Sequence, residues 1–244
     1  MDLINLSDLI DIAEENKYTV EYIEKDYFLT VLLYFLKDID GLYFKGGTAL
    51  NKIFLNQKRL SEDLDFTTKL EISELKKIIG KIVAENKPFF IKEEYDKQLN
   101  DFIRIKIYYK SFFSTSSYIW LDFNRRPTLL LEPEKYVLPN FYSLDFQITT
   151  LNKKELFAEK LCATITRNQP RDYFDLYFIL KNDSIDLKLT EKKLLSADKK
   201  LDFNMIFKNA NKIYSRWKDD ISKLTNYNLG YIECIKFLDS KLRK

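Results

Sequence analysis

The sequence contains no histidine among its 244 residues, and this absence excludes several kinds of site. A Ser-His-Asp or Cys-His mechanism, a zinc ion held by imidazole and a histidine general base all need a side chain that the chain does not have. Cysteine is nearly as scarce, since the chain has Cys162 and Cys234 alone. Two thiols cannot form a zinc site by themselves, and we expect both to be buried and reduced.

Long apolar runs are also missing. The longest, at 27–36, has ten residues, whereas a membrane helix needs about 20. The N-terminal segment 1–15 is acidic and lacks the basic region of a secretory signal, so we expect a cytoplasmic protein without a membrane partner. Forty basic and 37 acidic residues give a net charge of only +3, so any nucleic acid would have to be bound by a local basic patch.

Hydrophobic residues make up 45% of the chain, enough for a sizeable core, and their spacing changes along it. Helical spacing predicts helices at 7–16, 19–38, 73–87, 152–167, 171–178, 203–224 and 231–242, and aromatic and β-branched runs predict strands at 42–44, 63–66, 89–95, 102–109 and 118–124. The pattern predicts an α+β fold in which helices cover one side of a mixed sheet, residues 1–150, followed by a helical domain, residues 151–244.

A glycine pair, Gly46-Gly47, precedes Thr48 between the apolar run at 42–44 and an amphipathic stretch at 49–55. A strand would therefore turn into a helix at this point. Glycine lets a ligand approach the backbone closely, and the N–H groups of a first helical turn favour an anion such as phosphate. The segment indicates a phosphate-binding turn, although a simple tight turn would have the same composition.

Two aspartates, Asp63 and Asp65, alternate with Leu64 and Phe66 a short way further on. In an extended chain both carboxylates lie on one face. They repel each other unless a cation lies between them, and oxygen ligands of this kind suit Mg²⁺, which binds through carboxylates and substrate phosphates. The alternative is a solvated end of a strand.

A third aspartate, Asp122, lies in the predicted strand 118–124 and faces away from Leu121 and Phe123. If this strand lies beside the one with Asp63 and Asp65, Asp122 becomes a third carboxylate at the same metal site. On an edge strand it would face water instead. Arg126 follows the strand and belongs either to a solvated loop or near a bound phosphate.

A second group of charges lies in the helical half. Lys160 is in the helix predicted at 152–167, and Asp172 and Asp175 are three residues apart on one face of the next helix. Arg171 can reach Asp175 at i+4. A lysine suits a phosphate, and a neighbouring carboxylate keeps it charged and aimed, although a structural ion pair is the alternative. The pattern does not decide between Asp172 and Asp175 as the functional acid.

The order of strand, Gly-Gly-Thr turn, helix, basic loop and DxD strand resembles the active-site layout of the polymerase-beta-like nucleotidyltransferases. The fuller strings KGGTAL and RLSEDLDF closely resemble the AbiEii/AbiGii-type nucleotidyltransferase toxins of bacterial toxin–antitoxin and phage-defence systems. AEKLCATITR followed by RDYFDLYF is similar to the second signature of that family, and Glu24-Lys25-Asp26 resembles a segment that the family carries before its glycine turn. A solvated turn of a helix is the alternative for these three residues. Leu60 departs from the family, which usually has an aromatic residue there.

The resemblance implies a Mg²⁺-dependent nucleotidyltransferase with a two-metal site and a nucleoside triphosphate as substrate, on a polymerase-beta-like sheet whose active site is completed by the helical domain. The roles that it implies are metal binding for Asp63, Asp65 and Asp122, phosphate binding for Gly46, Gly47, Thr48 and Lys160, and catalysis or orientation of Lys160 for Asp172. Asp122 would also help to deprotonate the attacking hydroxyl. Supporting roles are expected for Ser61 and Arg126, and for Arg171 and Asp175, which would hold the two helices in register.

The expected acceptor is an RNA, for example a tRNA 3′ end, or else a protein. The expected biological role is that of the toxin in a type IV-like toxin–antitoxin pair, which implies a cognate antitoxin as partner. Two other functions fit the same residues. One is a nucleotide- or RNA-binding regulatory protein without turnover, and the other is a metal-dependent phosphodiesterase, which would leave the Gly-Gly-Thr turn unexplained.

Overall fold

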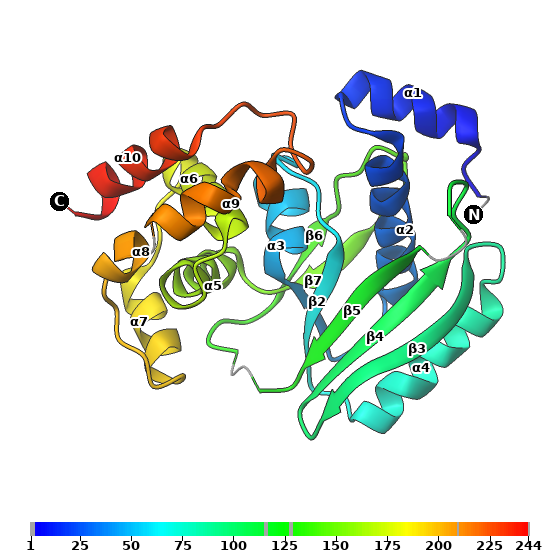
Figure 1. The fold of residues 1–244 in the computed structure, drawn as a ribbon. Coiled ribbons are helices and arrows are strands. Elements are labelled where there is room, and N and C mark those ends of the chain that lie inside the picture. The colour runs from blue at the N-terminus through cyan, green and yellow to red at the C-terminus, as the bar shows by residue number, and fades with distance from the viewer. Residues whose placement is uncertain (1–2, 115–116, 127–128, 209, 244) are drawn as a thin grey trace.

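In the computed structural model, which describes residues 3–114, 117–126, 129–208 and 210–243, seven strands form one mixed sheet with helices on one face and a group of helices beside it (Figure 1). The strands are β1 (Leu42–Lys45), β2 (Asp63–Thr68), β3 (Phe90–Leu99), β4 (Phe102–Tyr109), β5 (Tyr118–Asn124), β6 (Glu134–Val137) and β7 (Gln147–Thr150). Their order is β3-β4-β5-β2-β1-β7-β6. The predicted α+β class is confirmed.

The register of the central strands positions the acidic residues. β2 is parallel to β5, and Asp65 is the direct neighbour of Asp122, while Asp63 is the neighbour of Trp120. Side chains alternate along a strand. Leu64 on β2 and Leu121 and Phe123 on β5 therefore point to the other face of the sheet, into the core. The acidic side chains thus share the face that the core helices leave uncovered.

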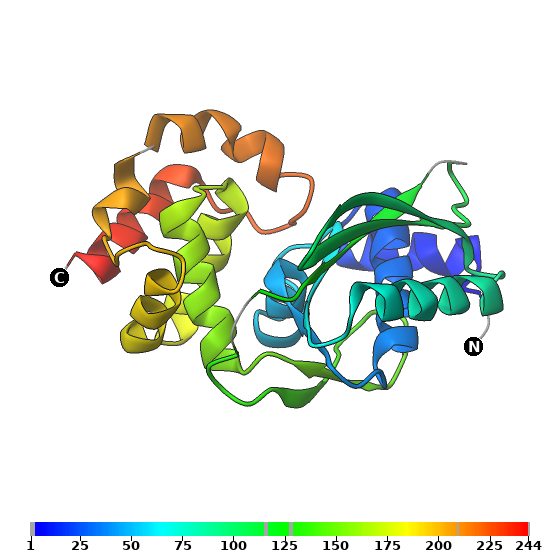
Figure 2. The same ribbon diagram turned by 90° about the horizontal axis from the view of Figure 1, so that it is seen from below.

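The first part of the chain contributes the helices α1 (Leu6–Asn16), α2 (Val20–Leu36), α3 (Gly46–Ala49) and α4 (Ile72–Glu85), and the π-helical turn η1 (Leu50–Phe54). α2 and α4 cover one face of the sheet (Figures 1 and 2). α2 is buried on nearly all sides, which agrees with its apolar composition. α1 begins at Leu6, one residue before the predicted range of 7–16. Its N-cap is Asn5, whose side chain accepts a hydrogen bond from the backbone N–H of Asp8 at 2.8 Å.

The second part is helical: α5 (Lys153–Thr166), α6 (Pro170–Asn182), α7 (Leu187–Leu195), α8 (Asn204–Lys208), α9 (Ala210–Ile221) and α10 (Tyr231–Leu242). The range 203–224, predicted as one helix, contains both α8 and α9. α6 is the central helix of a second hydrophobic core, which also includes Leu50 and Leu55 from the N-terminal half. The helical half therefore packs on η1, close to the glycine turn. The division into domains at residues 150 and 151 stays a prediction.

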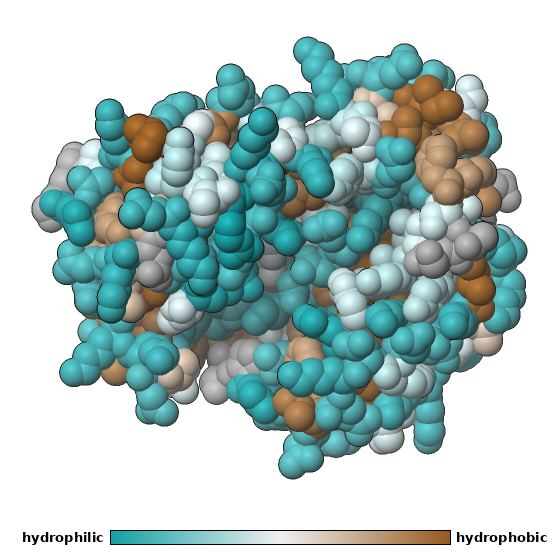
Figure 3. Space-filling view, viewed as in Figure 1, coloured by the Kyte–Doolittle hydropathy of each residue, from teal (hydrophilic) through white to brown (hydrophobic). Residues whose placement is uncertain are grey.

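Other expectations from composition concern membranes and thiols. Among the described residues, no helix combines the length and apolar character needed to span a bilayer. Both cysteines are free; Cys234 is buried, as expected, and Cys162 is only partly buried. The surface between the helical half and strands β4 and β5 is mostly hydrophilic (Figure 3).

Candidate active site

The turn between β1 and α3 needs glycine at its first position for two reasons. Gly46 has φ +76°, a conformation that other residues rarely adopt. A Cβ atom at Gly46 would also lie 2.1 Å from a carboxylate oxygen of Asp65. The glycine turn and the acidic strand are therefore in direct contact, and a side chain here would displace Asp65.

The rest of the turn is held by polar contacts to other segments. A Cβ atom at Gly47 would lie 2.7 Å from Nη2 of Arg59. The buried Thr48 donates a hydrogen bond from Oγ1 to the backbone oxygen of Asp63 at 2.6 Å. This hydroxyl fastens the turn to β2. That the backbone N–H groups of this turn bind phosphate stays a prediction.

Three carboxylates predicted to bind metal lie on β2 and β5. Burial, together with the negative charges of Asp63 and Asp122, raises the pKa of Asp65 from its ordinary value of 3.8 to about 7. Asp122 accepts two hydrogen bonds from Arg104 on β4, at 2.8 Å and 2.6 Å. In the part of the chain that the structure describes, no three acidic, cysteine or histidine side chains already stand close enough to enclose a metal ion.

A cavity of about 190 Å³ lies between the sheet and α5. It is lined by Lys45, Gly46, Gly47, Asp65, Leu156, Glu159, Lys160, Ala163 and Arg167. We call it the Lys160 pocket. It brings together the glycine turn, one carboxylate of the acidic strand and the lysine of the helical half, which are distant in sequence.

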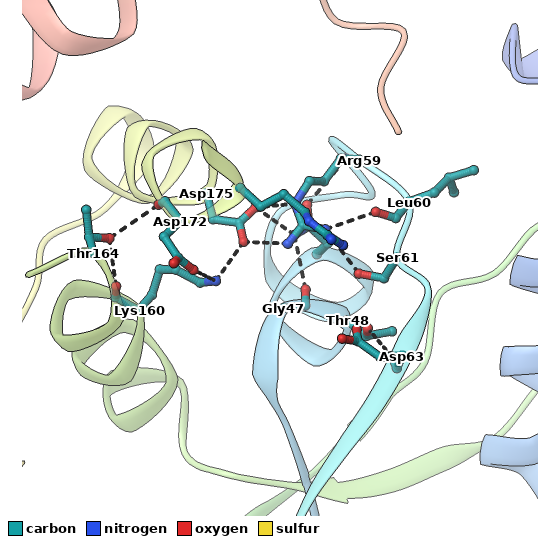
Figure 4. A network of polar contacts seen from close by, with 12 residues as sticks. Gly47, Thr48, Arg59, Leu60, Ser61, Asp63, Lys160, Thr164, Asp172 and Asp175 are labelled. Carbon is teal, nitrogen blue, oxygen red and sulfur yellow. Dashed lines mark hydrogen bonds and ion pairs between the residues drawn. The ribbon is translucent and has the colours of Figure 1, made fainter. Parts of the chain in front are cut away.

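Lys160 is fixed by two carboxylates of α6 (Figure 4). Its Nζ lies 3.0 Å from Oδ1 of Asp172 and 2.9 Å from Oδ2 of Asp175, and only 5% of its side chain is exposed. Asp172 also accepts hydrogen bonds from Nε and Nη2 of Arg167, at 2.7 Å and 2.6 Å. Burial opposes ionisation of Asp172, but the charges of Lys160 and Arg167 outweigh it and lower the pKa of this carboxyl.

Asp175 connects the two halves of the chain. It accepts hydrogen bonds from Nε and Nη2 of Arg59, each at 2.8 Å, and from the side chain of Asn51 at 2.9 Å. Asp175 also joins α6 to α5 through Lys160, at 2.9 Å, and its expected role in helix register stays a prediction. The predicted pair between Arg171 and Asp175 is wrong, because Arg171 instead reaches Glu62, at 3.3 Å, in the loop before β2.

Two further residues had been predicted to support the site. Ser61 accepts a hydrogen bond from Nη1 of Arg59 at 3.1 Å and thereby helps to hold the loop before β2. Arg126 pairs with Asp101 and lines a different cavity, together with Thr67 and Leu129. The structure does not bring Arg126 to the Lys160 pocket.

The segment Glu24-Lys25-Asp26 is not a solvated turn. Glu24 is buried and accepts hydrogen bonds from Oγ of Ser111 at 2.7 Å and from the backbone N–H of Phe112 at 2.6 Å. Asp26 is also buried, and its carboxylate lies 2.8 Å from Nζ of Lys52. These two acids anchor α2 to neighbouring segments, and Lys25 lies 4.0 Å from Glu62.

Sequence reasoning did not assign three arginines to the site: Arg59, Arg104 and Arg167. Arg59 is the first residue of the string RLSEDLDF, which contains Asp63 and Asp65. Arg104 alternates with apolar residues along its strand, as Asp122 does. These two positions indicated that Arg59 lies near the acidic strand and that Arg104 lies on the face of the sheet opposite the core. What the sequence could not supply was the partner of each arginine, since pairing depends on which strands and helices become neighbours.

The seven-stranded mixed sheet, with helices on one face and a helical half beside it, has the polymerase-beta-like nucleotidyltransferase fold. Residues 28–225 match the family described as "Nucleotidyl transferase AbiEii toxin, Type IV TA system", and the chain belongs to this family. The resemblance found in its motifs is thereby confirmed.

The chain is also similar to one further protein in sequence and to two solved structures in fold. The uncharacterized protein aq_aa25 of Aquifex aeolicus (strain VF5) is 28% identical over 173 residues, which cover 69% of this chain and 72% of that protein. The crystal structure of JHP933 from Helicobacter pylori superimposes with a TM-score of 0.63 at 20% identity and covers 93% of this chain and 92% of its own. MenT4, the nucleotidyltransferase toxin Rv2826c from Mycobacterium tuberculosis H37Rv, superimposes with a TM-score of 0.68 at 18% identity. The match covers 98% of this chain and 89% of MenT4.

Proposed function

We propose that the chain is a Mg²⁺-dependent enzyme that transfers a nucleoside monophosphate from a nucleoside triphosphate to an RNA, with a tRNA 3′ end as a candidate acceptor. The observation that carries the proposal is the position of Lys160, which lines one pocket with Gly46 and Asp65. A cation for the triphosphate, backbone N–H groups and a carboxylate for the metal are thus within one small space.

The acidic residues fit a magnesium site. Asp65 is buried beside two other carboxylates, and the raised pKa of Asp65 expresses a repulsion that a divalent cation would relieve. Asp63 and Asp65 would hold the ions, with Asp122 as the third ligand. Bound Mg²⁺ would neutralise charge on the triphosphate and on the attacking and leaving oxygens. Asp122 has Arg104 as its present partner, so its role as a ligand requires this pair to open.

The residues of the helical half would bind the triphosphate. Lys160 and Arg167 both line the pocket, and their charges would stabilise the leaving pyrophosphate. Asp172 contacts both of these cations and would keep them aimed, which favours it as the functional acid. Asp175 is fully buried among contacts to Arg59 and Asn51, so we assign it a structural role.

Labelling distinguishes this function from its alternatives. The protein would be incubated with each α-labelled nucleoside triphosphate, Mg²⁺, total RNA and total protein, and the products separated by class. Label in RNA supports the proposal, whereas label in protein assigns a protein acceptor. Binding of nucleotide without turnover would indicate a regulatory protein, and shortened RNA would indicate a phosphodiesterase.

The family description supports a biological role as the toxin of a type IV toxin–antitoxin pair. Such a toxin acts in the cytoplasm, where nucleoside triphosphates and RNA are available, and is opposed by a cognate antitoxin. Expression of the wild-type protein should therefore slow the growth of a host cell, and expression of the Asp63→Asn variant should not.

A further inference from the structure

Two acids and two cations form a row across four neighbouring strands, on the face of the sheet that carries the acidic residues. Asp65 on β2 is the direct neighbour of Asp122 on β5, and Asp122 is the direct neighbour of Arg104 on β4. On the other side of the row, Lys45 of β1 is the direct neighbour of Asp65. Neighbouring strands lie about 4.8 Å apart, so the two acids stand close together with one cation on each side.

The two cations of this row have different partners. Nζ of Lys45 lies 2.9 Å from a carboxylate oxygen of Glu159, which belongs to α5 and not to the row. Arg104 binds an acid of the row itself. Its Nε donates a hydrogen bond to Oδ1 of Asp122 at 2.8 Å, and its Nη2 donates one to Oδ2 at 2.6 Å. Arg104 is therefore the cation that engages a carboxylate proposed to bind metal.

The pair between Arg104 and Asp122 uses both oxygens of the carboxylate. The planar guanidinium matches a carboxylate in shape, so two parallel hydrogen bonds hold the acid in one orientation. A magnesium ion would need an oxygen of the same carboxylate, and the positive charge of the guanidinium would repel it. Metal binding by Asp122 and the pair with Arg104 therefore compete.

The Arg104 side chain can leave this pair without disturbing the core. It is 40% exposed, and its guanidinium carbon lies 5.1 Å from the centroid of the Trp120 ring. Exposed ion pairs and exposed contacts between a cation and an aromatic ring contribute little free energy. Release of the guanidinium into water is therefore inexpensive, while the two contacts are specific enough to aim it at Asp122.

Arg104 has two effects of the same sign on the acidic group. Asp63, Asp65 and Asp122 place three carboxylates on two neighbouring strands, and a cation beside them lowers their mutual repulsion. The same cation withdraws Asp122 from the other two acids. Arg104 thus stabilises the protein without metal and lowers its affinity for metal.

We propose that Arg104 is a positioning residue that sets the Mg²⁺ concentration at which the site assembles. It holds Asp122 in the protein without metal and releases this carboxylate when the ion binds. The inference rests on the nucleotidyl transfer proposed above and adds a regulatory residue on β4 to the same site. Because coupling between two binding events is reciprocal, the stability that Arg104 gives to the protein without metal equals the Mg²⁺ affinity that it removes.

Titration calorimetry with Mg²⁺ alone tests the inference without turnover. Arg104→Met keeps an unbranched side chain and removes the charge and both hydrogen bonds to Asp122. We expect this variant to bind Mg²⁺ about fivefold more tightly than the wild type. Equal affinities in the two proteins, or no measurable Mg²⁺ binding by either, would overturn the inference.

Lys106→Met is the matched control. Lys106 lies two residues from Arg104 on the same face of β4, and its Nζ is also 5.1 Å from the Trp120 ring centroid. Its acidic partners, however, are Glu94 and Asp96 on β3. Lys106→Met should bind Mg²⁺ as the wild type does. A gain equal to that of Arg104→Met would show a general effect of charge and would also overturn the inference.

Denaturation by urea at pH 8 separates a positioning role from a structural one. Arg104→Met should be less stable than the wild type without Mg²⁺, and the difference should disappear in saturating Mg²⁺, because the wild-type pair is then open. An ion pair with only a structural role would produce the same difference under both conditions, and this result would refute the role of Arg104.

The labelling assay separates this inference from the proposed function. Tighter Mg²⁺ binding by Arg104→Met, together with a wild type that transfers no label, supports the role of Arg104 and refutes the function. Transfer of label by a wild type whose Mg²⁺ affinity is unchanged in Arg104→Met refutes the role of Arg104 and leaves the function standing.

Discussion

Arg59 and Asp175 join the two halves of the chain by two parallel hydrogen bonds of 2.8 Å, and both side chains are almost completely buried. Removal of one member leaves the other charge buried without its partner, which costs about 3–5 kcal/mol. Arg59→Met should therefore lower the free energy of unfolding by about this amount, measured by urea denaturation.

The matched control is Arg171→Met. Its partner is Glu62 in the same loop, but both side chains of this pair are more than a third exposed, so its loss should cost less than about 1 kcal/mol. Equal losses for the two variants would show that the buried pair does not hold the halves together.

Asp172 and Asp175 both contact Lys160 and should behave differently when neutralised. In Asp172→Asn, Lys160 keeps Asp175 as its charged partner. The side chain of Arg167 is 60% exposed, so its guanidinium can be hydrated once the Asp172 carboxylate is lost. We expect an intact fold and a transfer rate lower by on the order of 100-fold. Asp175→Asn should lower the unfolding midpoint, because Arg59 loses its charged partner.

The measurements for this pair are the single-turnover transfer rate and the thermal midpoint of each variant. An active Asp172→Asn protein, or an Asp175→Asn protein of wild-type stability, would reverse the assignment of roles.

The pKa of Asp65 predicts how stability depends on pH. A carboxyl whose pKa is raised on folding binds its proton more tightly in the folded state, so folding is favoured below pH 3.8 and this advantage is lost as the pH rises to about 7. Asp65→Asn cannot ionise. Without divalent metal it should therefore be more stable than wild type at pH 8, by on the order of 3 kcal/mol, with the difference narrowing toward pH 4.

Mg²⁺ provides the control for this prediction. It should stabilise the wild type at pH 8 and stabilise Asp65→Asn much less, in denaturation curves recorded with and without the ion. If the stability of the wild type rose relative to that of Asp65→Asn between pH 4 and pH 8, the cause given for the raised pKa of Asp65 would be contradicted.

Gly46→Ala tests the contact between the glycine turn and the acidic strand. The new Cβ would meet the Asp65 carboxylate and would force alanine to a φ of +76°, so we expect both stability and transfer to fall. Gly80→Ala is the control, since Gly80 lies within α4, where the nearest atom to a new Cβ is a carboxylate oxygen of Glu93 at 3.4 Å. This change should raise stability by up to about 1 kcal/mol, because alanine favours the helix. If Gly80→Ala lost stability and Gly46→Ala did not, the predictions for both glycines would be contradicted.

Local patterns of the sequence predicted much of the site. The alternation at 63–66 placed both aspartates on one face, and helical spacing placed Asp172 and Asp175 on one face of α6. The family resemblance, and not the spacing, implied that Asp172 orients Lys160. The Thr48 hydroxyl was harder to predict, because its partner is a backbone oxygen on the next strand. Short-range periodicity thus found the functional side chains more readily than their partners.

Long-range pairing accounts for the remaining differences. Arg171 has a carboxylate four residues ahead on its own helix, yet packing brings Glu62 closer to it. Arg104 reaches Asp122 because β4 and β5 are antiparallel with these two residues as direct neighbours. Both outcomes depend on tertiary neighbours that composition and spacing do not determine.

Transfer of labelled nucleoside monophosphate to RNA by wild type and Asp63→Asn is the most direct measurement of the central claim. The substitution keeps the size of the side chain and removes one carboxylate charge beside Asp65, and Asp38→Asn, on an exposed side chain, is the control. We expect label in RNA with wild type and Asp38→Asn, and none with Asp63→Asn, whose unfolding midpoint should not fall. Equal label incorporation by wild type and Asp63→Asn would contradict the metal-dependent mechanism.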